Sequence, residues 1–260
     1  MIGRPKVSVL MVAHNSELFI KDSINSVVDQ EYSNWELVII NDASTDDTLT
    51  IIRQFKNKNI VVKNLSNNIG AYKATMLGLN YCKGKYISFL DSDDLMHKKK
   101  IIKQVKFLEN NSKIPIVFNW YEKINHKNKI LEKKKNFSDQ TKFDLLFPVQ
   151  NLICNSSVMF KRKILNQINF YNKDIIYAYD YNFYLKVFKK YKFGLLKNFY
   201  TKYRVYKFQR TQNTNLKKTI AKENIYFLNW SKKNYLINKS NIFYYYKNLM
   251  INYLKLFLIN

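Results

Sequence analysis

The feature that most constrains the fold of this sequence is a series of short apolar runs that alternate with helical patterns. The first run, Val7–Ala13, is rich in β-branched residues and apolar on both faces, as expected for a strand covered on both sides in a parallel sheet, and we interpret the later runs as strands too. We place these strands at Val7–Ala13, Trp35–Ile40, Ile60–Leu65 and Tyr86–Leu90. Strands separated by helices predict a right-handed, mostly parallel α/β sheet.

Polar residues follow three of these strands directly. They are His14-Asn15, Asn41-Asp42 and Asp91-Ser92-Asp93. In open α/β sheets, ligands bind beyond the carboxyl ends of the strands, so these residues are expected to gather at one edge. The sequence therefore predicts a single ligand site there.

The run ending at Leu90 is followed by three carboxylates within four residues, Asp91, Asp93 and Asp94. Like charges this close repel one another unless a cation or hydrogen-bond donors offset them. In a chain with 44 Lys+Arg and only 19 Asp+Glu, such a cluster indicates a divalent-metal site. The alternative is that Asp93 or Asp94 caps the helix that follows.

The remaining elements are weaker patterns. We expect Asn15 or Ser16 to cap a helix over 17–30, and Ser44 or Thr45 with Asp47 to begin one that reaches residue 55. Further helices are predicted over 70–82, 97–110 and 181–191, and further sheet elements over 114–121, 152–160 and 193–205. A Lys/Asn-rich hairpin or loop is expected through about residue 137.

The formal charge of +25 favours phosphate-bearing partners: nucleic acid, anionic lipid or a nucleotide-linked substrate. Biased codon usage offers another explanation of the lysine content. The two cysteines, Cys82 and Cys154, lie far apart and indicate neither a zinc site nor a disulfide framework, so we expect a reducing cytoplasm. The first apolar run is too short for a signal peptide or a spanning helix.

From residue 216 onward the sequence is rich in Lys, Asn and Tyr and has no Gly or Pro. We place a domain boundary near residue 210, which predicts a domain over 1–210 and a helical extension over 211–260. The stretch 242–259 is highly aromatic and is interrupted by lysines and asparagines. Two interpretations stay open: a helix that packs on the main domain, or one that lies on an anionic membrane.

Four motifs, in this order and spacing, resemble the inverting glycosyltransferases of family 2. They are V-S-V-L-M-V-A-H-N at 7–15, W-E-L-V-I-I-N-D-A-S-T-D at 35–46, N-I-G-A-Y-K-A at 68–74 and G-K-Y-I-S-F-L-D-S-D-D at 84–94. The resemblance continues through 155–162 and 170–185 and covers about the first 205 residues. It implies the GT-A nucleotide-diphospho-sugar fold.

The resemblance also implies site residues. Asp93 is expected to bind Mg²⁺ or Mn²⁺ directly, with Asp91 contacting the ribose or a metal-bound water. Asp94 is expected to cap a helix or support the metal ligands. The expected nucleotide-binding residues are Ala13, His14, Asn15, Asp42, Gly70, Lys73, Asp91, Ser92 and Arg204. Asp42 matches the acid that hydrogen-bonds the nucleobase, often a uracil, although Asn41 stands where many relatives have a second Asp.

Asp180 matches the Asp of the family's Glu-Asp motif and is assigned as the general base. The preceding Glu is replaced by Tyr179. A second departure is Tyr206, where relatives commonly have a His that assists diphosphate or metal binding. Arg204 or Lys207 is therefore expected to make the phosphate contact.

The resulting hypothesis is a metal-dependent inverting glycosyltransferase with a UDP-sugar donor and a glycan or lipid-linked glycan acceptor, acting in cell-surface polysaccharide synthesis. The alternatives are a degenerate protein of the same fold and a basic module that binds nucleic acid or membrane. We expect no nucleic-acid partner. The expected location is the cytoplasm, with peripheral contact of the C-terminal helices at the inner membrane face as an option.

Overall fold

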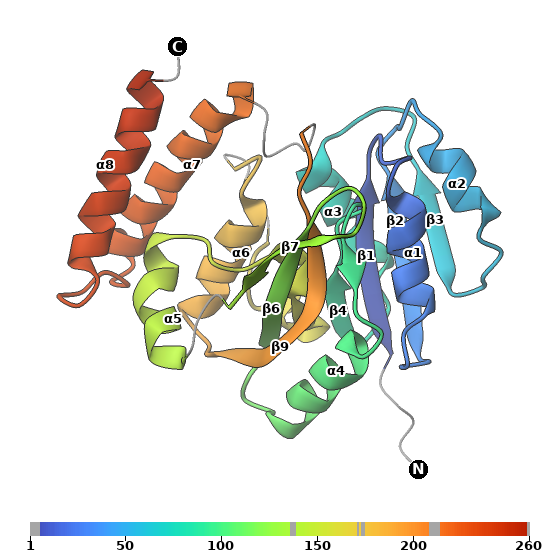
Figure 1. Cartoon of the computed structure of the whole chain (residues 1–260). Coiled ribbons are helices and arrows are strands. Elements are labelled where there is room, and N and C mark those ends of the chain that lie inside the picture. Colours follow the sequence, from blue (N-terminus) through green and yellow to red (C-terminus); the bar gives the residue numbers. More distant parts are fainter. Residues whose placement is uncertain (1–5, 136–138, 171, 173–174, 208–213, 259–260) are drawn as a thin grey trace. The chain divides into compact units, whose positions relative to one another are not determined.

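The computed structural model describes residues 6–135, 139–170, 172, 175–207 and 214–258 (Figure 1). The chain forms two compact units that alternate along the sequence. Unit 1 comprises Met1–Lys134, Cys154–Gln167 and Lys192–Arg204, and unit 2 comprises Lys135–Ile153, Ile168–Tyr191 and Val205–Asn260. Unit 2 thus contains residues on both sides of position 210, and the division into 1–210 and 211–260 stays a prediction.

Unit 1 is built on a sheet in which nine strands lie within the described residues. The strands are β1 (Val7–Ala13), β2 (Trp35–Asn41), β3 (Ile60–Asn64), β4 (Tyr86–Phe89), β5 (Leu95–Met96), β6 (Ile116–Ile124), β7 (Ile130–Lys134), β8 (Met159–Lys161) and β9 (Phe193–Arg204). Their order is β3-β2-β1-β4-β8-β6-β9-β5, and β7 pairs with β6. The first four strands are parallel, with Val9 opposite Leu37 and Ser88, which confirms the α/β prediction.

The second half of the sheet is mixed. Strand β8 is antiparallel to both β4 and β6, while β6 and β9 are parallel. The two-residue strand β5 pairs antiparallel with β9, so the acidic turn 91–94 is held between two paired strands. The sheet element expected over 152–160 was largely wrong, because residues Asn155–Ser157 form a 3₁₀ helix (η2) and pairing begins only at Met159.

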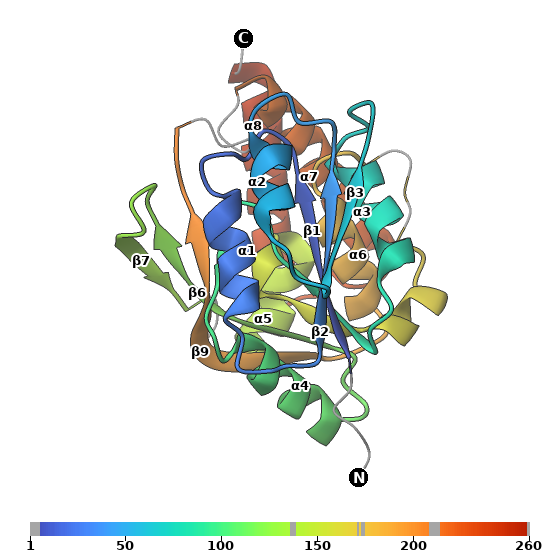
Figure 2. The ribbon, with the colours of Figure 1, turned by 90° about the vertical axis from the view of Figure 1, so that its right-hand side faces the viewer.

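Helices cover both faces of the parallel strands (Figures 1 and 2). They are α1 (Ile20–Val28), α2 (Thr48–Gln54), α3 (Ala71–Tyr81) and α4 (Lys100–Asn110), with a further 3₁₀ helix, η3 (Arg162–Asn166). Val9 and Met11 pack in one core with Ile24 of α1. On the other face α3 lies so close that a Cβ added at Gly78 would be 2.4 Å from Leu10 Cδ1.

Two helix starts differ from the sequence prediction. Helix α1 begins at Ile20 with no side-chain cap, because the Ser16 hydroxyl hydrogen-bonds elsewhere. Helix α2 begins at Thr48, whose backbone N–H donates to the carboxylate of Asp46 at 3.0 Å. The second Asp46 oxygen accepts the backbone N–H of Glu17 at 3.1 Å, so one carboxylate fastens both helix entries.

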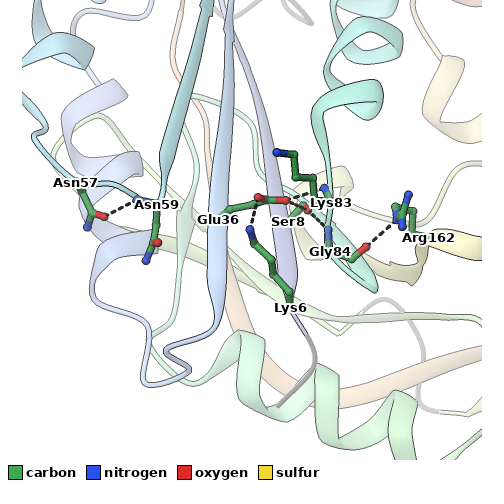
Figure 3. Close-up of polar contacts among 8 residues, drawn as sticks. All are labelled: Lys6, Ser8, Glu36, Asn57, Asn59, Lys83, Gly84 and Arg162. Carbon is green, nitrogen blue, oxygen red and sulfur yellow. Dashed lines mark hydrogen bonds and ion pairs between the residues drawn. The ribbon is translucent and has the colours of Figure 1, made fainter. Parts of the chain in front are cut away.

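A polar cluster at the amino ends of the strands fixes β1, β2 and β4 to one another (Figure 3). The buried carboxylate of Glu36 accepts from Ser8 Oγ at 2.6 Å and from the backbone N–H of Lys83 at 2.7 Å, and it pairs with Lys6 Nζ at 2.5 Å. Burial raises the pKa of Glu36, but these donors outweigh it and the net pKa is lowered. Ser8 Oγ also accepts the N–H of Gly84 at 2.8 Å.

Unit 2 contains α5 (Gln140–Leu146), the 3₁₀ helix η1 (Phe147–Val149), α6 (Tyr179–Phe188), α7 (Thr214–Lys233) and α8 (Ile242–Leu258). Aromatic rings dominate its core, with Phe143 and Phe147 stacked at 4.7 Å and Phe147 edge-on to Tyr181 at 5.5 Å. Tyr245 of α8 packs with Leu228 of α7 and Val149, so α8 contributes one face to this core. Within the described ranges, no helix has both the length and the hydropathy needed to cross a bilayer.

Candidate functional site

The loops after β1 and β2 are tied to each other. Asn15 Oδ1 accepts the backbone N–H of Thr45 at 2.9 Å, and the Asn15 N–H donates to Ser44 Oγ at 3.0 Å. His14 Nδ1 lies 2.8 Å from the carbonyl oxygen of Asp42. Asn15 and Ala43 both have left-handed backbones, with φ of 50° and 53°. Because a non-glycine residue rarely adopts this conformation, these hydrogen bonds hold two strained turns side by side.

Asp42 and Asn41 have different partners, although both are buried. The Asp42 carboxylate accepts the backbone N–H groups of Ile69 at 2.8 Å and Gly70 at 2.9 Å, and so holds the loop that begins α3. The Asn41 amide donates to Asn64 Oδ1 at 2.6 Å. Asn41 therefore fastens β2 to the end of β3. The Asp42 carboxylate instead lies at the loop that contains Gly70, one of the predicted nucleotide-binding residues.

The acidic turn after β4 is connected to the β1 loop and to η2. Ser92 Oγ lies 2.8 Å from Ser16 Oγ, and the Ser92 carbonyl accepts Ser23 Oγ at 2.8 Å. Asp91 Oδ1 accepts the side-chain amide of Asn155 at 3.0 Å. Asp91 and Asp93 are both partly exposed. The turn thus presents two accessible carboxylates on a backbone fixed from two sides.

Asp94 is not a helix cap, which corrects that part of the prediction. Helix α4 begins only at Lys100, after Lys99 at its N-cap position. Asp94 is fully buried, and its Oδ1 accepts the backbone N–H of Arg204 at 2.8 Å. Burial first, and then the charges of Asp93 and Asp91, raise the pKa of Asp94 well above its ordinary value.

Arg204 is also fully buried at the end of β9. Its Nε donates to the carbonyl of Asp93 at 2.7 Å and its Nη1 to the carbonyl of Asn125 at 3.1 Å. The guanidinium carbon lies 4.3 Å from the ring centroid of Phe19. These contacts hold the acidic turn against the β6–β7 hairpin and the α1 entry, so a phosphate contact of Arg204, which stays a prediction, would require some of them to rearrange.

A buried lysine, Lys100, is connected to the acidic turn through Ser156. Lys100 Nζ donates to the carbonyl of Ser156 at 2.6 Å and to Ser88 Oγ at 3.1 Å. Burial lowers its pKa to about 7. Ser156 Oγ in turn accepts the backbone N–H of Asp91 at 3.0 Å. Ser156 of η2 therefore connects Lys100 to the backbone of Asp91, the first residue of the turn.

The donor set restricts what kind of metal could bind here. Among the described residues, no group of three or more His, Cys, Asp or Glu side chains is arranged as a metal cage. Asp91 and Asp93 alone fit a hard cation such as Mg²⁺ or Mn²⁺, which takes oxygen ligands and shares its coordination sphere with phosphate and water. After burial, the charges of Asp93 and Asp91 raise the pKa of Asp94 further, and such a cation would offset those two charges.

Unit 2 carries Asp180 in the first turn of α6. Asp180 Oδ1 accepts the N–H of Tyr181 at 2.7 Å, and the ring of Tyr179 lies 6.3 Å from that of Phe170. Tyr179 is thus part of an aromatic contact at the position where the family motif has a Glu.

Glu223 of α7 was not predicted as a functional residue. Its buried carboxylate accepts the N–H groups of three successive residues just before α6: Ile176 at 2.7 Å, Tyr177 at 3.1 and 3.2 Å, and Ala178 at 2.8 Å. The available signal was its isolation, because Glu223 is the only acidic residue after Asp180. A lone acid in a long basic helix indicates a specific partner.

The structure therefore brings together, within unit 1, most of the predicted donor-site residues. Direct hydrogen bonds or adjacent positions connect Ala13, His14, Asn15, Asp42, Gly70, Asp91, Ser92 and Asp93. Lys73 is exposed in the first turn of α3, and Arg204 is buried behind the turn. Asp180 belongs to unit 2. The roles assigned to these residues stay predictions.

The chain is similar in sequence to known glycosyltransferases. The family described as "Glycosyl transferase family 2" matches residues 8–169. An uncharacterised glycosyltransferase of Methanocaldococcus jannaschii is 29% identical over 94% of this chain and 87% of its own length. A UDP-Glc:α-D-GlcNAc-diphosphoundecaprenol β-1,3-glucosyltransferase of Escherichia coli is 30% identical over 70% of each chain.

Solved structures share the fold. A mannosyltransferase of Pyrobaculum calidifontis, in complex with GDP-Man and Mn²⁺, superposes with a TM-score of 0.68 over 99% of this chain and 74% of its own, at 14% identity. This likeness shows a GT-A fold. Because the family match spans more than half of the sequence, the chain belongs to glycosyl transferase family 2 and is a glycosyltransferase.

Proposed function

We propose that the protein transfers a sugar, with inversion, from a UDP-sugar to a glycan or lipid-linked glycan acceptor in cell-surface polysaccharide synthesis, and that it requires Mg²⁺ or Mn²⁺. One observation carries the proposal: hydrogen bonds join the loops after β1 and β2 and the acidic turn after β4 at one edge of the sheet, through Asn15–Thr45 and Ser16–Ser92. The E. coli relative, whose name specifies UDP-Glc and a diphosphoundecaprenol-linked acceptor, supports the choice of donor and acceptor.

Donor binding is assigned to the loops of unit 1. Each oxygen of a carboxylate can accept two hydrogen bonds, so Asp42 can hold the N–H groups of Ile69 and Gly70 and still has lone pairs for the imide N–H of a uracil. Because Asp42 is buried, the base would reach its carboxylate only after a shift of the surrounding loop. The exposed His14 lies beside Asp42 and can contact the base or a phosphate. The exposed Lys73 can reach the diphosphate from the start of α3.

Asp93, with Asp91, would hold the divalent cation. When bound, the cation neutralises the charge that develops on the departing diphosphate. Asp94, Arg204 and Lys100 hold the turn, through the contacts described above, so that the two accessible carboxylates keep their spacing. The buried side chains therefore contribute rigidity, and the partly exposed ones contribute ligands.

Asp180 would act as the base on the acceptor. The acceptor hydroxyl forms the new bond to the anomeric carbon while its proton passes to the Asp180 carboxylate. The bond between that carbon and the β-phosphate oxygen breaks, and UDP leaves with the bonding electrons. Attack on the face opposite the leaving group inverts the anomeric configuration.

Isothermal titration of UDP with and without Mn²⁺ tests the donor site. We expect Mn²⁺ to tighten UDP binding to the wild type, and Asp93→Asn to abolish this dependence while Asp144→Asn, an exposed acid of α5, retains it. Equal UDP affinity of wild type and Asp93→Asn at every Mn²⁺ concentration would contradict the metal assignment.

A turnover assay tests the base and the alternative of a degenerate protein. Asp180→Asn should keep UDP affinity and lose turnover by about 10²-fold or more, the usual scale of a general base. If the wild type bound UDP-sugars but showed neither transfer nor hydrolysis over a panel of acceptors, the degenerate alternative would replace the proposal. The cytoplasmic location also stays a proposal, supported by the free thiols of Cys82 and Cys154.

A further inference from the structure

Helix α8 has two faces of very different surroundings. Tyr245 and Asn252, on one side, are 3% and 6% exposed and belong to the interior of unit 2. Phe243, Met250 and Phe257, on the other side, are 68%, 60% and 75% exposed. The helix therefore packs against its own unit and still leaves large apolar side chains in contact with solvent.

These exposed side chains form a continuous strip, which we call the α8 face. Its members recur at intervals of three or four residues and so lie on one side of the helix. They are Phe243, Tyr246, Met250, Tyr253, Leu254 and Phe257, and each is at least 44% exposed. A contiguous apolar patch rarely persists on a protein surface without an interaction partner.

Lysines lie on and beside the α8 face. Lys247 and Lys255 are exposed on the same helix, which has no acidic residue. Lys232 of α7 lies with its Nζ 5.9 Å from the ring centroid of Tyr246. Residues 181–260 contain 17 Lys+Arg and a single acid, Glu223, whose carboxylate is buried against three backbone amides. Helices α7 and α8, which carry and border the face, therefore have a strong excess of positive charge.

We propose that the α8 face is a docking surface for an anionic lipid bilayer. Amphipathic helices with aromatic and aliphatic residues on one side and lysines alongside bind in the interfacial region, where apolar side chains enter the acyl boundary and lysines contact headgroup phosphates. A second copy of the chain fits less well, because two-fold pairing of this face would bring lysines of both copies together with no acid to offset them. This inference is independent of the donor and acceptor assigned above.

Vesicle flotation of the full chain tests the inference. Vesicles of phosphatidylcholine alone are compared with vesicles that contain about 30% phosphatidylglycerol, at low and high salt. The test variant is Met250→Ser/Leu254→Ser/Phe257→Ser. The matched control is Ile130→Ser/Leu131→Ser on β7, where the two side chains are 44% and 57% exposed. Circular dichroism and UDP titration confirm that each variant is folded.

We expect the wild type and the β7 control to float with the anionic vesicles, more weakly at high salt, and the α8 variant to lose at least about tenfold in partitioning. Three results would each overturn the proposal. They are absence of wild-type flotation, equal flotation of the α8 variant, and a wild-type dimer in light scattering that the α8 substitutions convert to a monomer without any binding to vesicles.

Discussion

Replacement of Glu223 should reduce turnover, by disturbing the segment that positions Asp180, and should leave UDP binding unchanged. In Glu223→Gln one carboxylate oxygen becomes an NH₂ group that must face a backbone N–H. If the remaining oxygen still accepts the N–H groups of Ile176 and Tyr177, the N–H of Ala178 loses its acceptor, which lies 2.8 Å away in the wild type. Hydrogen bonds to charged groups contribute about 1.5–3 kcal/mol each, so we expect unfolding free energy to fall by about 2–3 kcal/mol.

The catalytic effect should exceed the effect on binding. The three amides end one residue before α6 begins, and Asp180 is the second residue of that helix. A displacement of about 1 Å at a catalytic group can reduce turnover by 10²-fold, so we expect kcat to fall by about tenfold or more while the Kd for UDP stays unchanged. Glu223→Asp, which keeps the charge on a shorter side chain, should recover part of both losses.

Urea unfolding, UDP titration and initial rates measure these three quantities, with rates taken at a temperature where each variant is folded. Asp144→Asn removes one exposed charge from the same unit and serves as the control, with no change expected in any of them. If Glu223→Gln unfolded at the wild-type midpoint and turned over at the wild-type rate, the carboxylate would not be what holds the segment before α6.

Three further predictions concern unit 1. Glu36→Gln should lower the unfolding free energy by about 1.5–3 kcal/mol at pH 7. Because the folded pKa of Glu36 is lowered, its stabilisation is present above about pH 4.5 and is lost as pH falls through the folded value. The unfolding free energies of wild type and Glu36→Gln, measured by urea titration, should therefore converge in acid. Lys100 has a folded pKa of about 7 against an ordinary 10.5, so the unfolded chain binds the extra proton between these values and the contribution of Lys100 to stability should rise with pH there. The difference in unfolding free energy between wild type and Lys100→Met should therefore shift in favour of the wild type as pH rises in the same titration. Gly78→Ala should destabilise by about 1–3 kcal/mol in thermal unfolding, because the new Cβ would meet Leu10 Cδ1 at 2.4 Å, and shortening that side chain with Leu10→Ala should relieve the clash.

The parallel half of the sheet was predictable because each of its strands contains a local apolar run that is bounded by polar residues. The predicted ranges for β1 and β3 match the structure to within one residue. Strand β5 was not predictable, since its two residues become a strand only by pairing with β9, about a hundred residues later. The 3₁₀ helix at residues 155–157 was missed for a similar reason, because its backbone carbonyls accept long-range hydrogen bonds from the side chains of Lys100 and Gln104.

Within the site, sequence patterns identified the polar residues at the strand ends but not their hydrogen-bond partners. Asp94 matched a helix-cap pattern, yet its carboxylate is bound by the backbone of Arg204, 110 residues away. Glu223 has no local pattern at all, because its partners are backbone amides whose positions depend on the packing of α6 and α7. Such contacts arise from tertiary structure, and spacing along the chain does not encode them.

The alternation of the two units along the chain governs where the protein can be cut. Truncation after residue 210 would keep every strand of unit 1 but would remove α7 and α8 from unit 2. Val149 would then lose Leu228 and Tyr245, and the three amides before α6 would lose Glu223. A fragment chosen to contain the sheet alone would thus retain the donor loops while unfolding the segment that carries Asp180. Internal substitution is therefore the sounder way to dissect this enzyme.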